Sequence, residues 1–105
     1  MRHFLTLVVV SVFSLPALFA ETTTELAERF ALADDREAVV ASLVPGTDEH
    51  FYYRCLLWQH QGKLPEVDAL LPRWEALHPD SGLRPRIHLR QAALWFDRDP
   101  IAGAQ

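Results

Sequence analysis

The sequence contains one cysteine, Cys55, in 105 residues. A single thiol cannot form an intramolecular disulfide, so a small domain made from this chain must be held together by packing, even in an oxidising compartment. Metal-ligand spacing is also absent, because Cys55 and His60 lie about 140° apart around a helix and cannot bind one ion from it. We therefore expect no metal and no cofactor, and we interpret Cys55 as a small buried hydrophobe.

Signatures of catalysis and of nucleic-acid binding are also missing. The chain has no glycine-rich phosphate loop, no HExxH and no GxSxG motif, and no pair of acidic residues is spaced for acid–base work. The formal net charge is -4, which leaves no basic surface large enough to neutralise a run of phosphates. These absences predict a protein that is not an enzyme and does not bind nucleic acid.

The N-terminus carries the longest apolar run of the chain. Arg2 provides positive charge, residues 4–15 are almost entirely apolar, and a small residue, Ala20, precedes the polar stretch that begins at Glu21. This order is typical of a secretory signal peptide. It predicts cleavage between Ala20 and Glu21, with cleavage after Ala17 as the alternative.

Two other interpretations of the leader stay open. It could be a buried core helix, although the polar residues directly after it argue against that, or a permanent membrane anchor, since its length approaches the roughly twenty residues that span a bilayer. No cysteine lies directly after the leader, where it could carry a lipid. We expect residues 1–20 to be a signal peptide and the protein to be exported to the periplasm or outside the cell, with membrane contact only if the leader is retained.

Residues 21–105 are expected to form a helical domain of about five helices. Thr22 with Glu25, and Asp34 with Glu37, have the three-residue spacing of a capping box and predict two helix starts. The second helix should continue through AVVASLV to the terminating pair at residues 45–46. The first two helices are therefore expected to form a hairpin.

The next helices have similar start and stop signals. Thr47 or Asp48 should cap a helix over residues 49–61, which Gly62 should end because glycine tolerates a left-handed turn. Pro65 suits the first turn of a fourth helix, whose apolar stripe continues to Pro79. Pro72 interrupts the backbone ladder of that helix, so we expect one bent helix.

A fifth helix is predicted over RPRIHLRQAALWFD, where Pro85 occupies the first turn and Ile87, Gln91 and Leu94 lie along one side. Asp99 and Pro100 have the form of a further helix start. Because few residues follow, residues 21–105 are interpreted as the possible N-terminal part of a longer protein.

Helix, short turn, helix occurs twice in this order, and a third unit begins. In the second unit, bulky residues on a first helix precede a turn at Gly62, and an apolar residue and a proline, Leu77 and Pro79, close the second helix. Residues 51–79 thereby resemble a tetratricopeptide-type helical hairpin. They depart from that pattern at Pro72, inside the second helix, and where Leu70 or Leu71 replaces a central alanine. The resemblance implies a non-catalytic scaffold with a concave surface for a peptide or protein.

One charged segment is the candidate binding site. Its basic side chains are Arg84, Arg86, His88 and Arg90. They would attract an acidic partner, although solvent alone could also satisfy them. The three tryptophans could stack a flat ligand, but each lies on an apolar stripe, which favours packing between helices.

Together these features predict an all-α protein in which antiparallel helical hairpins stack as a short alpha-solenoid. The expected function is an exported, non-catalytic scaffold for protein–protein interaction, with a protein or acidic peptide as its partner. Two alternatives remain. The chain could be the accessory N-terminal domain of a larger exported enzyme, or a membrane-anchored envelope protein.

Overall fold

The computed structural model describes residues 21–99, and this part of the chain is all-α, with no strand. Its helices, in order along the chain, are α2 (Thr23–Leu32), α3 (Arg36–Ala41), α4 (Asp48–His60), α5 (Leu64–Leu77) and α6 (Arg84–Arg98). They form two compact units that divide after Ala33, with α2 in the first and α3 to α6 in the second. The predicted all-α fold class is confirmed.

The first unit contains α2, which begins where the capping pattern predicts. The Thr22 side chain accepts a hydrogen bond from the Glu25 amide at 3.1 Å. Leu26 and Phe30, four residues apart, are the buried residues of this helix. The predicted signal peptide, residues 1–20, lies outside the described range. Ala20, the last residue before the predicted cleavage site, lies outside it as well.

Helix α3 differs from its prediction at both ends. Asp35 is the N-cap, accepting a hydrogen bond from the Ala38 amide at 3.1 Å, so the assignment of the cap to Asp34 is wrong by one residue. The helix stops at Ala41, although we expected it to continue for three more residues. The hydroxyl of Ser42 donates to the Val39 carbonyl at 2.6 Å, a local bond by which serine competes with helix continuation.

Helix α4 is the central helix of the second unit, because it contacts α3, α5 and α6. Thr47 caps it by accepting from the His50 amide at 3.2 Å, and Gly62 follows its end with a positive φ of 74°. Its buried residues alternate with partly buried ones and are Phe51, Tyr53, Cys55, Leu57 and Gln59. Such a spread over the helix surface agrees with contacts on several sides.

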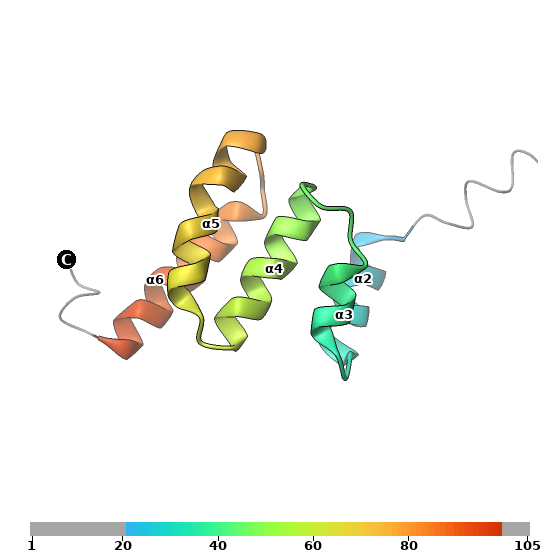
Figure 1. The fold of residues 1–105 in the computed structure, drawn as a ribbon, viewed down its shortest axis with the longest axis horizontal. Coiled ribbons are helices and arrows are strands. Elements are labelled where there is room, and N and C mark those ends of the chain that lie inside the picture. The colour runs from blue at the N-terminus through green and yellow to red at the C-terminus, as the bar shows by residue number, and fades with distance from the viewer. Residues whose placement is uncertain (1–20, 100–105) are drawn as a thin grey trace, which may run out of the picture. The chain divides into compact units, whose positions relative to one another are not determined.

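Helix α5 is continuous through Pro72, as predicted, and packs beside α4 in the opposite direction (Figure 1). The apolar stripe was expected to continue to Pro79 and to bury Leu77. That part of the prediction is wrong, because Leu77 is 53% exposed at the helix end. Helix α6 then contacts both α4 and α5. The further helix predicted after Asp99 lies outside the described residues.

The core of this unit is an apolar cluster contributed by α4, α5 and α6. Its buried members are Phe51, Cys55, Val67, Leu71, Trp74 and Ile87. Trp74 is fully buried and stacks on Phe51, with ring centroids 5.9 Å apart and planes 9° from parallel. Of the three tryptophans, Trp74 therefore fits the packing interpretation most fully, whereas Trp58 and Trp95 are only partly buried.

None of the helices within residues 21–99 has the length and the hydrophobicity needed to cross a membrane.

Candidate interaction surface

Two buried glutamines join α6 to α4 and α5. The Gln91 amide donates to the Leu64 carbonyl at 2.7 Å and to the Asp68 carboxylate at 3.1 Å. The Gln59 amide donates to the Gln91 side-chain oxygen at 3.1 Å and to the Ile87 carbonyl at 3.2 Å. Each buried amide thus has partners, which avoids the cost of burying an unpaired polar group.

This network reaches the protein surface at both ends. The indole N–H of Trp95 donates to Asp68 at 2.9 Å, and the Arg90 Nε donates to the side-chain oxygen of Gln59 at 3.2 Å. One side of α6 is therefore bound to its neighbours by directional bonds as well as by apolar contact. The orientation of α6 determines which of its residues face outward.

The structure separates the four basic residues that the sequence suggested as a binding site. Arg84 is partly buried, and its guanidinium donates to the carbonyls of His78 and Pro79, so it stabilises the connection between α5 and α6. Arg90 is engaged with Gln59. Arg86 and His88 are exposed, and they lie on different sides of the helix, about 160° apart. Partner binding by this set stays a prediction, and Arg86 is its best-placed member.

An apolar stripe lies on the outer side of α6, which we call the outer stripe. It consists of Leu89, which is 75% exposed, Ala93, and Phe96, which is 50% exposed. At about 100° per residue, Leu89 and Phe96 point about 160° to 180° away from the buried Ile87. Single exposed apolar residues are ordinary, but three in register on one helix mark a possible contact surface.

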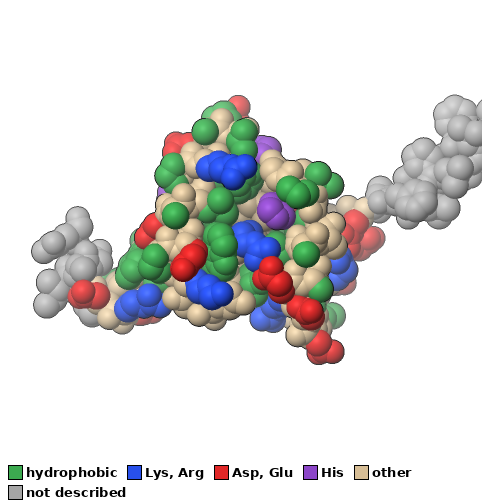
Figure 2. Space-filling view, in the orientation of Figure 1, with side chains coloured by type: hydrophobic (Ala, Val, Ile, Leu, Met, Phe, Trp, Pro, Cys, Tyr) green, Lys and Arg blue, Asp and Glu red, His purple; other side chains and the backbone are tan. Residues whose placement is uncertain are grey.

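The charged side chains of the α4 and α5 face do not form a comparable patch. Figure 2 shows Lys and Arg side chains spread singly among hydrophobic side chains over these helices. An ion pair between Arg54 and Glu37 joins α4 to α3 at 2.8 Å. This face offers mixed charge.

A shallow groove of about 420 Å³ runs between α5 and α6. It is lined by Asp68, Leu71, Pro72, Glu75, His88, Gln91, Ala92 and Trp95. Pro72 cannot donate a backbone N–H to the Asp68 carbonyl one turn before it, which leaves a hydrogen-bond acceptor beside the groove. Two of the polar side chains of the groove, Asp68 and Gln91, are already paired with each other.

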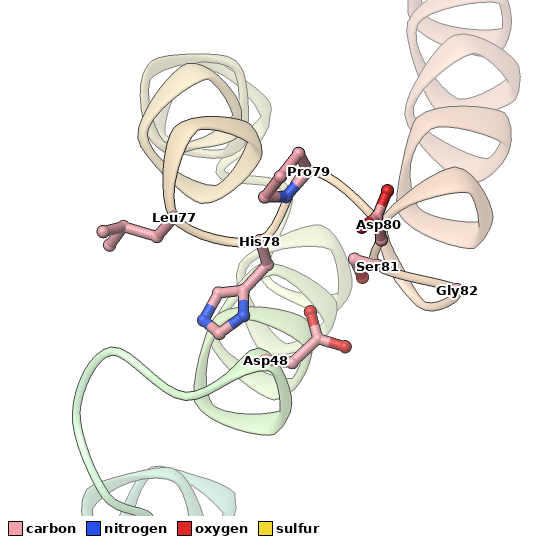
Figure 3. A pocket seen from close by; sticks show the side chains of 7 residues that line it. All are labelled: Asp48, Leu77, His78, Pro79, Asp80, Ser81 and Gly82. Carbon is pink, nitrogen blue, oxygen red and sulfur yellow. The ribbon is translucent and has the colours of Figure 1, made fainter.

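A second depression, of about 360 Å³, lies at the turn after α5, where His78 and Asp48 face the same space (Figure 3). These polar groups have structural partners. The Asp48 carboxylate accepts from the Trp74 indole at 2.7 Å, and His78 Nε2 lies 2.7 Å from the Gly46 carbonyl oxygen. Ser81 accepts two backbone N–H bonds from the start of α6. The arrangement stabilises the turn and contains no nucleophile paired with a base.

The described residues contain no group of three or more His, Cys, Asp or Glu side chains placed to hold a metal ion. Cys55 is fully buried, and burial raises the pKa of its thiol to about 12. A thiol that stays protonated is a poor nucleophile. Its position agrees with the interpretation of Cys55 as a core residue.

Comparison with known proteins gives no relative: no protein-family model, curated protein or solved structure matches the chain.

The basic segment of α6 is evident in the sequence, whereas the outer stripe on the same helix was not predicted. Leu89, Ala93 and Phe96 have spacings of four and three residues, which is the signal that could have revealed it. This spacing does not by itself indicate a surface, because the inner stripe of the helix, with Ile87 and Gln91, has the same periodicity. Only tertiary contacts show which of two apolar stripes is buried.

Proposed function

We propose that this protein is a non-catalytic, exported helical-repeat scaffold that binds a protein partner through α6. The resemblance of α4 and α5 to a tetratricopeptide-type hairpin supports the repeat part of the proposal. In a solenoid of such hairpins, the first helix of the next unit packs on both helices of the preceding one, as α6 does on α4 and α5. The apolar leader at residues 1–20 supports export.

The observation that carries the proposal is the outer stripe. Leu89 and Phe96 present large apolar side chains to solvent on a helix whose orientation is held by the glutamine network. Arg86 lies beside the stripe and is exposed. An amphipathic helix with acidic residues at the edge of its apolar face would satisfy both features, since helix recognition depends on apolar contacts at helical spacing and on complementary charge.

The test is affinity capture from a cell-envelope extract, with the purified full chain as bait. The substitutions Arg86→Glu and Leu89→Glu together should abolish capture of a specific partner while far-UV circular dichroism stays unchanged, because both side chains are exposed. The matched control is Arg73→Glu, which makes the same charge reversal at an exposed position on α5. Equal capture by the α6 variant, the control and the original chain would exclude α6 as the binding surface.

Export is tested separately by the mass of the protein that the cell secretes. A product starting at Glu21 agrees with cleavage of the leader. A product that retains Arg2 would show that the leader stays attached, and the proposal of a cleaved, exported scaffold would be abandoned.

A further inference from the structure

The outer stripe of α6 has a form that two helices can share. Leu89, Ala93 and Phe96 follow the alternating four- and three-residue spacing by which helices form a straight seam. The small residue, Ala93, lies between the two large ones. A small side chain at the middle of a seam lets two helix backbones approach closely, and the large residues on either side can then fill the space beside it.

The charges beside the outer stripe are arranged asymmetrically along the helix. Arg86 lies in the first turn of α6 and Asp97 in the last, and both side chains are exposed. Their separation of eleven residues brings the two side chains to within about 20° of each other around the helix axis, so they flank the same edge of the stripe. This edge is therefore positive at the beginning of the helix and negative at its end.

A reversed copy of the same helix complements this edge. If two α6 helices pair antiparallel with Ala93 near the centre, Arg86 of each copy lies within roughly 3 to 5 Å along the axis of Asp97 of the other, and symmetry makes the pair twice. In a parallel pair, the two-fold axis runs along the helices, so the edge that carries Arg86 and Asp97 in one copy lies beside the opposite edge of the other copy. The two Arg86–Asp97 pairs then do not form.

We propose that the partner of the outer stripe is a second copy of this chain, bound through an antiparallel α6–α6 contact. The inference rests on the proposed function, in that it names the partner of the same surface. An unrelated acidic helix would be complementary to Arg86 but would be repelled by Asp97, whereas the chain itself is complementary to both.

The size of the stripe determines how strong this dimer is. A fifteen-residue helix is about 22 Å long, and a contact along one face of it is smaller than the roughly 1,200 Å² that stable interfaces bury. The dimer should therefore be weak, with a dissociation constant on the order of 100 µM. Such an affinity is measurable, and it would increase wherever the protein is locally concentrated.

Sedimentation equilibrium of the full chain, in the form that the expression host accumulates, tests the proposal over concentrations from about 10 µM to 1 mM. The variants are Arg86→Glu, Asp97→Arg and the double variant that carries both changes. Each single change should weaken self-association by about tenfold, because it replaces two attractive pairs by two repulsive ones. The double variant exchanges the charges and should regain most of the original affinity. An equimolar mixture of the two single variants should form the mixed dimer.

Several results would overturn the proposal. One is a wild-type chain that stays monomeric over the whole range; others are self-association that neither single change weakens and a double variant that remains as weak as the singles. Circular dichroism of each variant verifies that the fold is kept.

The Asp97→Arg variant separates this inference from the proposed function, since it should weaken the dimer yet leave capture of an acidic foreign protein unchanged or stronger. A monomeric chain that still captures such a protein would refute only the self-pairing.

Discussion

The indole of Trp74 provides a measurable test of how the core of the second unit is held. Trp74 is fully buried, stacks on Phe51 and donates its N–H to the Asp48 carboxylate at 2.7 Å. Truncation to alanine would cost roughly 3 to 5 kcal/mol and could unfold a domain this small. Trp74→Phe is the better perturbation, because it keeps an aromatic ring against Phe51 and removes the donor.

The expected cost of Trp74→Phe has two parts. A hydrogen bond to a charged acceptor contributes about 1.5 to 3 kcal/mol, and Asp48 lies toward the low end because it is only partly buried and water can replace the indole. The smaller ring also leaves part of the indole volume empty in a closely packed core. We expect a loss of about 2 kcal/mol in the free energy of unfolding, which corresponds to a fall in Tm of roughly 8 to 16 °C for a domain of this size.

Urea denaturation followed by circular dichroism measures this loss, and a double-mutant cycle with Asp48→Ala isolates the bond itself. The two changes should couple by about 1 kcal/mol. Trp58→Phe is the matched control, since Trp58 is only partly buried, and it should cost less than about 1 kcal/mol. A coupling free energy near zero would refute the claim that the indole and the carboxylate stabilise the fold together.

Three further predictions concern single side chains. Because burial raises the pKa of Cys55 to about 12, iodoacetamide should leave this thiol unmodified near neutral pH until urea unfolds the chain, and stoichiometric labelling of the folded protein would contradict its burial. Burial, aided by nearby arginines, lowers the pKa of His50 and of His60, so the folded state favours neutral imidazoles. The contribution of these neutral side chains to the free energy of unfolding is complete above the unfolded pKa of about 6.5. It is lost as the pH falls through the pKa values of the folded state. The Tm should therefore be lower at about pH 5.5 than at about pH 7.5, and glutamine at both positions should reduce that difference; an unchanged difference would assign it to other groups. Gly62→Ala should cost about 1 kcal/mol in the free energy of unfolding, because alanine is strained at a φ of 74°. Gly82→Ala is the control, since no atom lies within 4 Å of the added carbon there. Equal Tm values for the two variants would contradict the strain at Gly62.

Helix boundaries were predictable from the sequence where they depend on neighbours a few residues away. Thr22 and Thr47 cap α2 and α4 through bonds to an amide three residues on, and Gly62 ends α4 with a left-handed turn. Each of these signals lies within one helical turn of its effect. The prediction at Asp34 was wrong because the capping-box spacing to Glu37 selects Asp34, whereas the carboxylate one residue later, on Asp35, accepts the amide of Ala38.

The candidate site was less predictable because its members are selected by contacts between distant segments. Arg84 belongs to the same basic run as Arg86, yet it is partly buried and its guanidinium donates to the carbonyls of His78 and Pro79 before α6. Gln91 was expected on the same side as Ile87, but its partners lie 23 to 32 positions earlier in the chain. An amide can pair with almost any polar group, so its partners follow from the arrangement of the helices, which periodicity does not contain.

The two buried glutamines also affect the entropy of binding at α6. A shift of α6 by one turn would bring Ile87 or Trp95 to the place of Gln91. Neither side chain could donate both of the hydrogen bonds that the Leu64 carbonyl and the Asp68 carboxylate accept from the Gln91 amide. The helix therefore has one favourable register on its neighbours. A partner that binds α6 meets a surface whose backbone is already fixed, so little conformational entropy is lost there on binding, and even a short stripe can retain a measurable affinity.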